Sequence, residues 1–392
     1  MLVLLLSLYL QPYQTTKARM RTIQMVDLQT QYQRIQSEVE QAFAEVIRSG
    51  AFINGPTVKT FQQNLAEYLR CRHVIACGNG TDALQIALMA LDLQPGDEII
   101  TSPFTFVATA EVIKLLGLVP IFVDVEADSF NINPELIEAA ITPKTRCIIP
   151  VHMFGRACNM QAIMDIAAKH QLFVVEDNAQ AIGATCEVDG ISRKIGSIGD
   201  IGCLSFYPSK NLGAFGDGGA INTNSDNLKR TIHRICNHGS EQRYYYESVG
   251  VNSRLDSLQA VLLDIKLVHL DGYILSRNKL ADYYDMALAG AGDFILPARP
   301  KDGQHVFHQY TLRTPQRDAL QQFLNAQEIP TMVYYPVPLH LQKPYMDDRH
   351  AEGMLPVSEQ LCREVLSLPM HTEMETEQAA HIIKQVINFY KS

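Results

Sequence analysis

Residues 73–84 read His73-Val-Ile-Ala-Cys-Gly-Asn-Gly80-Thr81-Asp-Ala-Leu84. A short apolar run is followed by two glycines around an asparagine, and then by Thr-Asp at the head of an apolar segment. This order predicts a buried strand, a tight turn and a helix N-terminus. Main-chain N–H groups at a helix N-terminus point outward and the helix dipole favours an anion, so the turn is a candidate phosphate site.

Strand-like and helix-like segments alternate from about residue 70 to residue 225. This alternation predicts an α/β fold with a mainly parallel sheet covered by helices, and the loops at the carboxyl edge of such a sheet bind ligands. A helix is expected at 159–170. Strands are expected at 73–77, 98–101, 121–125, 147–151, 172–176, 202–206 and 219–222.

The pattern changes after a long helical stretch that runs from Asp256 to about Leu288, because a loop rich in glycine and proline follows at 290–303. The last part reads strand 308–313, helix 317–328, strand 331–335 and a closing helix 376–390. A chain of 392 residues with 47% apolar content can form a large domain and a smaller one. We expect the large domain at 23–275 and the small C-terminal domain at 276–392.

The first ten residues are apolar but lack a basic start, are too short to span a bilayer, and precede no A-x-A-like cleavage site. A weak signal peptide is one interpretation, and a non-native extension is the one we favour, so residues 1–22 are expected to lie outside the fold. No membrane association is expected.

A net charge of -9 without a dense basic run argues against nucleic acid as a partner. Eight scattered cysteines with no C-x-x-C pair predict reduced thiols in a cytoplasmic protein, and we expect no metal site.

Gly78-x-Gly80-x-x-Ala83 also matches a dinucleotide-binding fingerprint. That fingerprint requires an acidic residue at the end of the next strand, whereas Asp97 and Glu98 stand at its beginning. An NAD-dependent oxidoreductase is therefore the weaker alternative.

Two further segments contain residues suited to cofactor chemistry. Glu176-Asp177 ends an apolar strand, and a carboxylate there could hold the protonated pyridine nitrogen of pyridoxal 5'-phosphate (PLP); we choose Asp177, although such a pair is also typical of a helix cap. In Ser205-Phe-Tyr-Pro-Ser-Lys210-Asn-Leu-Gly213, Lys210 could reach a cofactor aldehyde if burial lowers its pKa, although most lysines in turns are solvated.

These segments occur in order with Pro103-Phe-Thr-Phe106, Asp177-x-Ala-Gln180 and Gly250-Val-Asn252-Ser-Arg254. From about Ile23 to Tyr390 the chain resembles the DegT/DnrJ/EryC1/StrS family of sugar aminotransferases. The resemblance implies the PLP-dependent transferase fold type I, like aspartate aminotransferase. It also implies transfer of an amino group from L-glutamate to a nucleotide-linked keto-sugar, in amino-sugar or cell-surface polysaccharide biosynthesis.

The resemblance further implies roles for single residues. Lys210 would bond to the cofactor and move the proton, Asp177 would pair with the pyridine nitrogen, Gln180 would contact the ring hydroxyl and Phe106 would stack on the ring. The implied phosphate contacts are Gly80, Thr81 and Ser205, with Asn252 from the neighbouring subunit of a homodimer with shared sites. The implied substrate-side residues are Arg254, His308, Tyr335 and His340.

Three questions stay open at this point. Relatives that carry His in place of Lys210 remove a sugar hydroxyl, so Lys210 favours transamination over a PLP dehydratase, and a non-catalytic sugar-sensing regulator would require lost cofactor residues. The sugar could be a UDP-linked 3-oxo-uronate or a TDP-linked 3-oxo- or 4-oxo-6-deoxyhexose, and the segment 334–340 favours the 3-oxo group. Asn178 stands where the family often has alanine, and its role is undecided.

Overall fold

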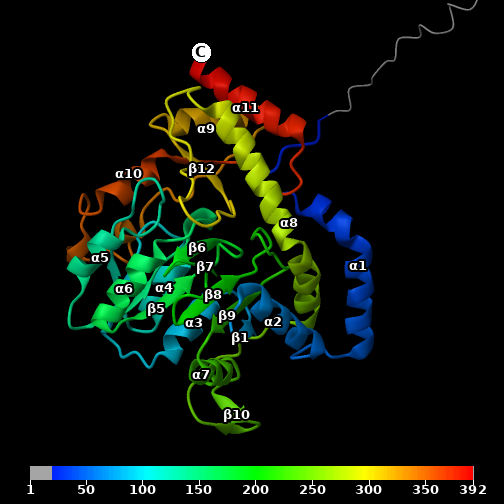
Figure 1. Ribbon diagram of the computed structural model, residues 1–392, viewed down its shortest axis with the longest axis vertical. Coiled ribbons are helices and arrows are strands. Elements are labelled where there is room, and N and C mark those ends of the chain that lie inside the picture. The colour runs from blue at the N-terminus through cyan, green and yellow to red at the C-terminus, as the bar shows by residue number, and fades with distance from the viewer. Residues whose placement is uncertain (1–19, 392) are drawn as a thin grey trace, which may run out of the picture.

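The computed structural model of the chain describes residues 20–391 (Figure 1). Most of the predicted N-terminal extension lies outside these residues. Arg21 and Thr22, which we placed in the extension, contact the start of the closing helix α11 (Thr376–Lys391). The Nε of Arg21 pairs with Glu375, just before the helix, and Gln378 of the helix donates to the carbonyl oxygens of Arg21 and Thr22. The backbone of these two residues is therefore bonded to the folded part, and the expected boundary after residue 22 stays a prediction.

A seven-stranded sheet forms the centre of the larger part of the molecule. Its order is β1-β9-β8-β5-β4-β2-β3; neighbours from β8 to β3 are parallel, and β9 is antiparallel to both of its neighbours. The strands are β1 (His73–Cys77), β9 (Gly219–Thr223), β8 (Ile201–Ser205), β5 (Phe173–Asp177), β4 (Thr145–Ile149), β2 (Glu98–Thr101) and β3 (Val119–Phe122). All seven expected strands are present, with the largest shift at the end of β3, which ends at Phe122 rather than Val125.

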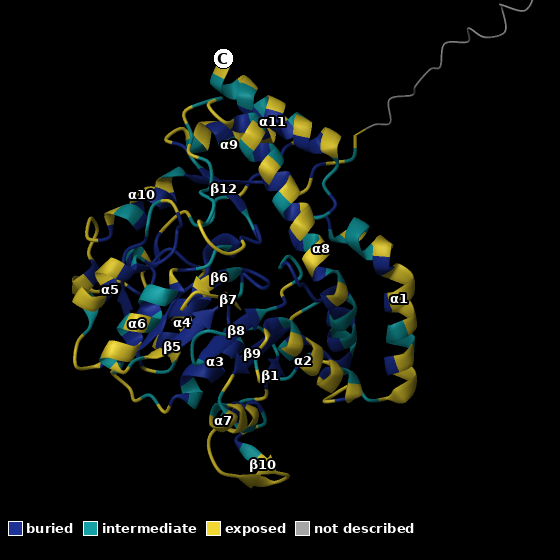
Figure 2. Ribbon diagram, in the orientation of Figure 1, coloured by how far each residue is buried: buried dark blue, intermediate teal, exposed yellow. Residues whose placement is uncertain are grey.

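Helices cover both faces of this sheet, because side chains alternate along each strand. Val74 and Ala76 of β1 pack into one apolar cluster and Ile75 and Cys77 into the other. Figure 2 shows the sheet as buried and the outer faces of the helices as exposed. One face packs against α2 (Pro56–Leu69), α5 (Pro134–Ala140), α6 (Met160–His170) and α8 (Ser257–Leu288), and the other against α3 (Gly80–Ala90), α4 (Ala108–Leu115) and α7 (Asp226–Cys236).

A second core lies in the C-terminal part, at the top of Figure 1. Leu280 and Tyr284 of α8 belong to it, whereas Leu263 and Leu270 of the same helix belong to the core of the large part. Because α8 runs through the expected boundary between 275 and 276, that boundary stays a prediction. The other elements here are β12 (Tyr310–Arg313), α9 (Arg317–Ala326), α10 (Pro356–Glu364), β13 (Val365–Leu368) and α11.

The remaining elements lie at the periphery of the two cores. Helix α1 (Leu28–Ser49) packs along α8, and α7 leads into the projecting hairpin of β10 (Ser240–Gln242) and β11 (Tyr245–Tyr246). A second hairpin joins β6 (Thr185–Val188) to β7 (Ile191–Lys194). Short 3-10 turns lie at Met153–Gly155, Leu339–Leu341 and Asp348–His350.

One expected strand is wrong. Within 331–335 only Met332 pairs, in an isolated bridge to Ser367. Pro330 and Pro336 flank the segment and have no N–H to donate to a ladder, so extended pairing stops there. The strand expected from residue 308 begins instead at Tyr310.

All eight cysteines are free thiols, and seven of them are buried. Among residues 20–391, no helix is both long and apolar enough to cross a bilayer.

Candidate active site

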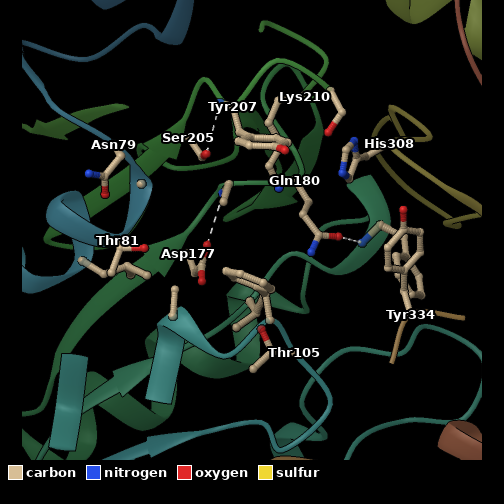
Figure 3. A pocket seen from close by; sticks show the side chains of 18 of the residues that line it. Asn79, Thr81, Thr105, Asp177, Gln180, Ser205, Tyr207, Lys210, His308 and Tyr334 are labelled. Carbon is tan, nitrogen blue, oxygen red and sulfur yellow. Dashed lines mark hydrogen bonds between the residues drawn. The ribbon is translucent and has the colours of Figure 1, made fainter. Parts of the chain in front are cut away.

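A cavity of about 520 Å³ lies at the carboxyl ends of β5 and β8, a size typical of small-molecule sites. Figure 3 shows its side chains, with Asn79, Thr81 and Ser205 on one side and Lys210 and His308 on the other. Nine residues predicted from the sequence line it: Gly80, Thr81, Phe106, Asp177, Gln180, Ser205, Lys210, His308 and Tyr335.

The N-terminus of α3 forms one end of the cavity. Asn79 caps the helix through its side-chain oxygen, which accepts from the N–H of Asp82 at 2.8 Å, and Gly80 and Thr81 follow in the first turn. A Cβ on Gly80 would lie 2.7 Å from the Cβ of Ser205, so only glycine allows the helix to approach the end of β8 this closely. The open N–H groups and the Ser205 hydroxyl suit a phosphate.

Asp177 and Glu176 are adjacent at the end of β5 and therefore point to opposite faces. Glu176 is fully buried behind the site, where it accepts hydrogen bonds from the N–H groups of Gly196, Ile198 and Gly199. It also accepts from Nε2 of His152 at 3.0 Å. Glu176 is thus satisfied by the fold itself.

The carboxylate of Asp177 faces the cavity. Its Oδ2 accepts from the Thr109 hydroxyl at 2.8 Å, and its Oδ1 accepts from the N–H of Ala179 at 3.2 Å. These two donors orient the group without neutralising it. Asp177, rather than Glu176, is thus placed to receive a cationic ring nitrogen.

Lys210 lies in the turn that follows β8. Its N–H donates to the Tyr207 carbonyl oxygen at 2.8 Å, and a Cβ on Gly213 would lie 2.2 Å from the Pro208 carbonyl oxygen, so the turn is too tight for any other residue there. Burial of its amine lowers the pKa of Lys210 to about 8, while the charge of Asp177 partly opposes this shift. At pH 7 about a tenth of this amine is unprotonated, far more than for a lysine of ordinary pKa, and this fraction can act as a nucleophile or proton acceptor.

Two more predicted residues form the opposite wall. Gln180 accepts from the N–H of Phe154 at 2.9 Å and donates to the Tyr335 hydroxyl at 3.3 Å, which fixes its amide. Phe106 is 55% exposed and borders the cavity, so its ring is available for stacking on a ligand.

His308 is buried in the wall of the cavity, beside Lys210 (Figure 3). Its Nδ1 has no hydrogen-bond partner among residues 20–391. Burial, together with the positive charges of Lys210 and Arg277, holds the pKa of His308 well below its usual value, so the imidazole is neutral.

Three predicted residues do not line the cavity. His340 is fully buried beside α10, with its Nε2 3.2 Å from a Glu359 carboxylate oxygen, because the turn at 339–341 docks against Pro103. The structure thus places His340 away from the cavity, and its expected substrate role stays a prediction. Asn252 is exposed and Arg254 is half-buried; both flank Ser253, whose hydroxyl bonds to Asp82 at the start of α3.

The sequence analysis did not predict several of the residues that line the cavity. Asn178, whose role was undecided, does not line it. Asn178 instead donates to the Ile195 carbonyl oxygen at 2.9 Å. Tyr207 stands within the quoted lysine segment, so its spacing could have indicated it. Thr109 does not line the cavity but orients Asp177, and it carries no such signal because this contact spans 68 positions. The other missed lining residues are Asn79, Leu84, Thr105, Ala108, Val151, Phe154, Ala179, Ser209, Asp217, Gly218, Gln309 and Tyr334.

The fold and the site together define a class of protein. A glycine-lined phosphate cradle, a carboxylate, a lysine of lowered pKa and an open aromatic ring border one cavity, and these groups fit PLP. The molecule has the architecture of the fold type I transferases that depend on this cofactor.

The sequence pattern of the DegT/DnrJ/EryC1/StrS aminotransferase family matches residues 33–387, and the chain belongs to this family. It is 46% identical to the "pleiotropic regulatory protein" of Geobacillus stearothermophilus, over 94% of this chain and 99% of the relative. It is 42% identical to the UDP-2-acetamido-2-deoxy-3-oxo-D-glucuronate aminotransferase of Pseudomonas aeruginosa, over 90% and 96% of the two chains.

A solved structure, DesV of S. venezuelae in complex with a ketimine intermediate, superposes with a TM-score of 0.91. It shares 39% identity and covers 95% of this chain and all of its own. The predictions of family, fold class, cofactor class and aminotransferase activity are thereby confirmed.

Proposed function

We propose that this protein transfers the amino group of L-glutamate to the 3-oxo carbon of a nucleotide-linked sugar. The observation that supports this most directly is Lys210, whose pKa is lowered and which shares one cavity with Asp177 and the phosphate cradle at α3. The name of the Pseudomonas aeruginosa relative supports a 3-oxo sugar carried by UDP. The free cysteines are compatible with a cytoplasmic enzyme.

Different residues of the cavity would hold different parts of the cofactor. The first turn of α3 and Ser205 would hold the phosphate, Asp177 would pair with the ring nitrogen, Gln180 would contact the ring hydroxyl and Phe106 would stack on the ring. When bound, PLP acts as a sink for the electrons released at the carbon that carries the amine. Selectivity for the sugar must therefore come from the outer cavity.

Lys210 moves the proton in both half-reactions. As an unprotonated amine it accepts the proton from the α-carbon of glutamate, and as an ammonium it returns a proton to the sugar carbon that takes the amine. Glutamate leaves as 2-oxoglutarate before the sugar binds in the same cavity. This order predicts ping-pong kinetics.

We further propose a homodimer in which a second copy completes the site. Asn252 and Arg254 lie outside the cavity of their own chain, and Asn252 is exposed. In the dimer Asn252 would reach the partner's phosphate cradle and Arg254 the nucleotide sugar. His308 and Tyr335 supply the substrate contacts within the chain.

The test is the visible absorption of the purified protein with PLP, before and after L-glutamate, for the wild type and Lys210→Ala. We expect a band in the wild type that bleaches with glutamate and is restored by a UDP- or TDP-linked 3-oxo sugar, and neither response in Lys210→Ala. A band that ignores glutamate but responds to the sugar would indicate a dehydratase instead. A protein that takes up no PLP would indicate a regulator, the role that the name of the Geobacillus relative suggests for that protein.

A further inference from the structure

Arg277 lies in the middle of α8 and is 4% exposed. Its Nη1 donates to three main-chain carbonyl oxygens, those of Phe307 at 3.0 Å, His308 at 3.3 Å and Met370 at 3.1 Å. No carboxylate pairs with it among residues 20–391, and its Nε has no hydrogen-bond partner there. The core of this protein thus contains a guanidinium held only by backbone oxygens.

Such a group is costly, because a buried charge without a counter-charge loses its hydration and gains little in return. Burial alone lowers the pKa of Arg277 to about 10, which leaves it charged at neutral pH. A hydrophobic residue would pack against the apolar part of α8 at less cost. The benefit must therefore lie in the backbone that Arg277 holds.

Two of the three carbonyls belong to the segment that brings His308 into the cavity wall. Phe307 has a positive φ of 44°, an unfavourable conformation for an aromatic residue, so the backbone turns sharply just before His308. His308 and Gln309 both border the cavity, and regular strand pairing resumes only at Tyr310. The guanidinium bridges this turn to Met370, which follows β13.

We propose that Arg277 is a positioning residue of the active site. It fixes the turn at Phe307-His308, so that the imidazole of His308 stays beside Lys210 and offers a neutral hydrogen-bonding nitrogen to the keto-sugar. The inference rests on the proposed function, because it assigns His308 to the sugar. Charged groups act on the imidazole from two segments, Lys210 after β8 and Arg277 on α8, and Asp177, Tyr334 and Tyr335 border the same cavity.

A double-mutant cycle of Arg277→Met and His308→Ala tests the coupling between the two residues. We expect Arg277→Met to lower kcat/KM for the keto-sugar about 30-fold when His308 is present, but less than about threefold when His308 is already alanine. Arg277→Lys keeps a cation with several donors and should restore most of the loss. If Arg277→Met does not fold, Arg277→Lys replaces it in the cycle, with a smaller loss of about fivefold and the same non-additivity expected.

Arg317→Met is the matched control. Arg317 on α9 also donates to a main-chain oxygen, that of Cys362 at 3.2 Å, but it does not border the cavity. Its loss should lower thermal stability and leave kcat/KM for the sugar within about twofold. Additive losses in the cycle would overturn the proposal, since Arg277 would then act on the fold as a whole.

A second readout does not depend on turnover. In protein with ¹⁵N-labelled histidine, the His308 ring signal, identified by its absence in His308→Ala, should remain that of a neutral imidazole at pH 6 in the wild type. In Arg277→Met its pKa should rise, because one of the two nearby positive charges is gone. An unchanged titration would also contradict the proposal. If glutamate does not bleach the band, the proposed function fails and the cycle has no activity to measure. The titration of His308 still tests the positioning by Arg277, so the two failures can be distinguished.

Discussion

Asp177 and Glu176 show how two adjacent carboxylates acquire different roles. Three main-chain N–H groups and His152 satisfy Glu176, whereas Asp177 receives only Thr109 and the N–H of Ala179. Only the second carboxylate has acceptor capacity left for a ligand. An asparagine in place of Asp177 would be neutral and could not stabilise the positive charge of a protonated ring nitrogen.

We predict that Asp177→Asn lowers kcat by about 100- to 1000-fold, the range found for the loss of one preorganised electrostatic group. Steady-state kinetics with glutamate and the keto-sugar would measure this. Thr109→Val, which removes only one hydrogen bond to the same carboxylate, should cost about tenfold or less. Equal losses in the two variants would show that orientation, not charge, is the contribution of Asp177.

Lys266 is a second lysine with a low pKa, and it lies outside the cavity. It is 1% exposed, donates to the Gly213 carbonyl oxygen at 2.7 Å behind the Lys210 turn, and burial lowers its pKa to about 8. In the unfolded chain its pKa is near 10.4. Between these two values the unfolded chain binds more protons than the folded protein, so stability must rise with pH in that window.

We predict that the free energy of unfolding of the wild type, minus that of Lys266→Met, rises by about 2 kcal/mol from pH 7.5 to pH 9.5. Well below pH 8 the lysine is protonated in both the folded and the unfolded state, and the difference no longer changes with pH. Urea titrations at the two pH values would measure it, and Lys210 cancels because both proteins contain it. A difference that falls with pH would contradict the inferred pKa of Lys266.

The N-terminus of α3 works as a unit, because Asn79, Gly80 and Ser205 must approach one another closely. We predict that Gly80→Ala weakens PLP binding by about tenfold or more, since the added Cβ would push α3 away from Ser205. Fluorescence or absorption titration of the cofactor-free protein would measure this.

Gly272→Ala is the control for this change. Gly272 lies within α8, and no atom lies within 4 Å of a Cβ added at this position. It should stabilise the protein by up to about 1 kcal/mol through helix propensity and leave PLP affinity unchanged. Equal weakening in both variants would point to a general effect of alanine and not to the cradle.

The complete molecule, in our proposal, is a dimer with shared sites, which two inactive variants can test together. In a mixed dimer of Lys210→Ala and Asn252→Ala chains, one of the two sites would hold both Lys210 and the partner's Asn252. Random pairing makes about half of the dimers mixed, so co-expression should recover about a quarter of the wild-type activity.

The control pairs Lys210→Ala with Asp177→Asn. Both residues belong to the cavity of one chain, so the mixed dimer holds one site without the lysine and one without the aspartate. No recovery beyond the separate variants is expected. Recovery of activity in this control would contradict the proposed shared site. So would a lack of recovery when Lys210→Ala is paired with Asn252→Ala.

Much of the fold and of the candidate site could be predicted from local sequence patterns. The seven strands of the sheet, the turn before α3 and the lysine segment follow from short apolar runs, glycines and motif spacing, which depend on neighbours in the chain. Segment 331–335 has the same apolar character, yet its flanking prolines leave it with a single bridge. Family membership followed from the order of the motifs.

Other features depend on packing between distant segments. The amino-acid order presents Glu176 and Asp177 alike, and the loop at Gly196–Gly199 decides between them by satisfying the first. His340 stands in a motif-like segment but docks under α10, and Arg277 shows its role only when α8 meets the turn at Phe307. Side-chain direction and burial depend on contacts between residues far apart in the chain, and the local spacing of residues cannot predict those contacts.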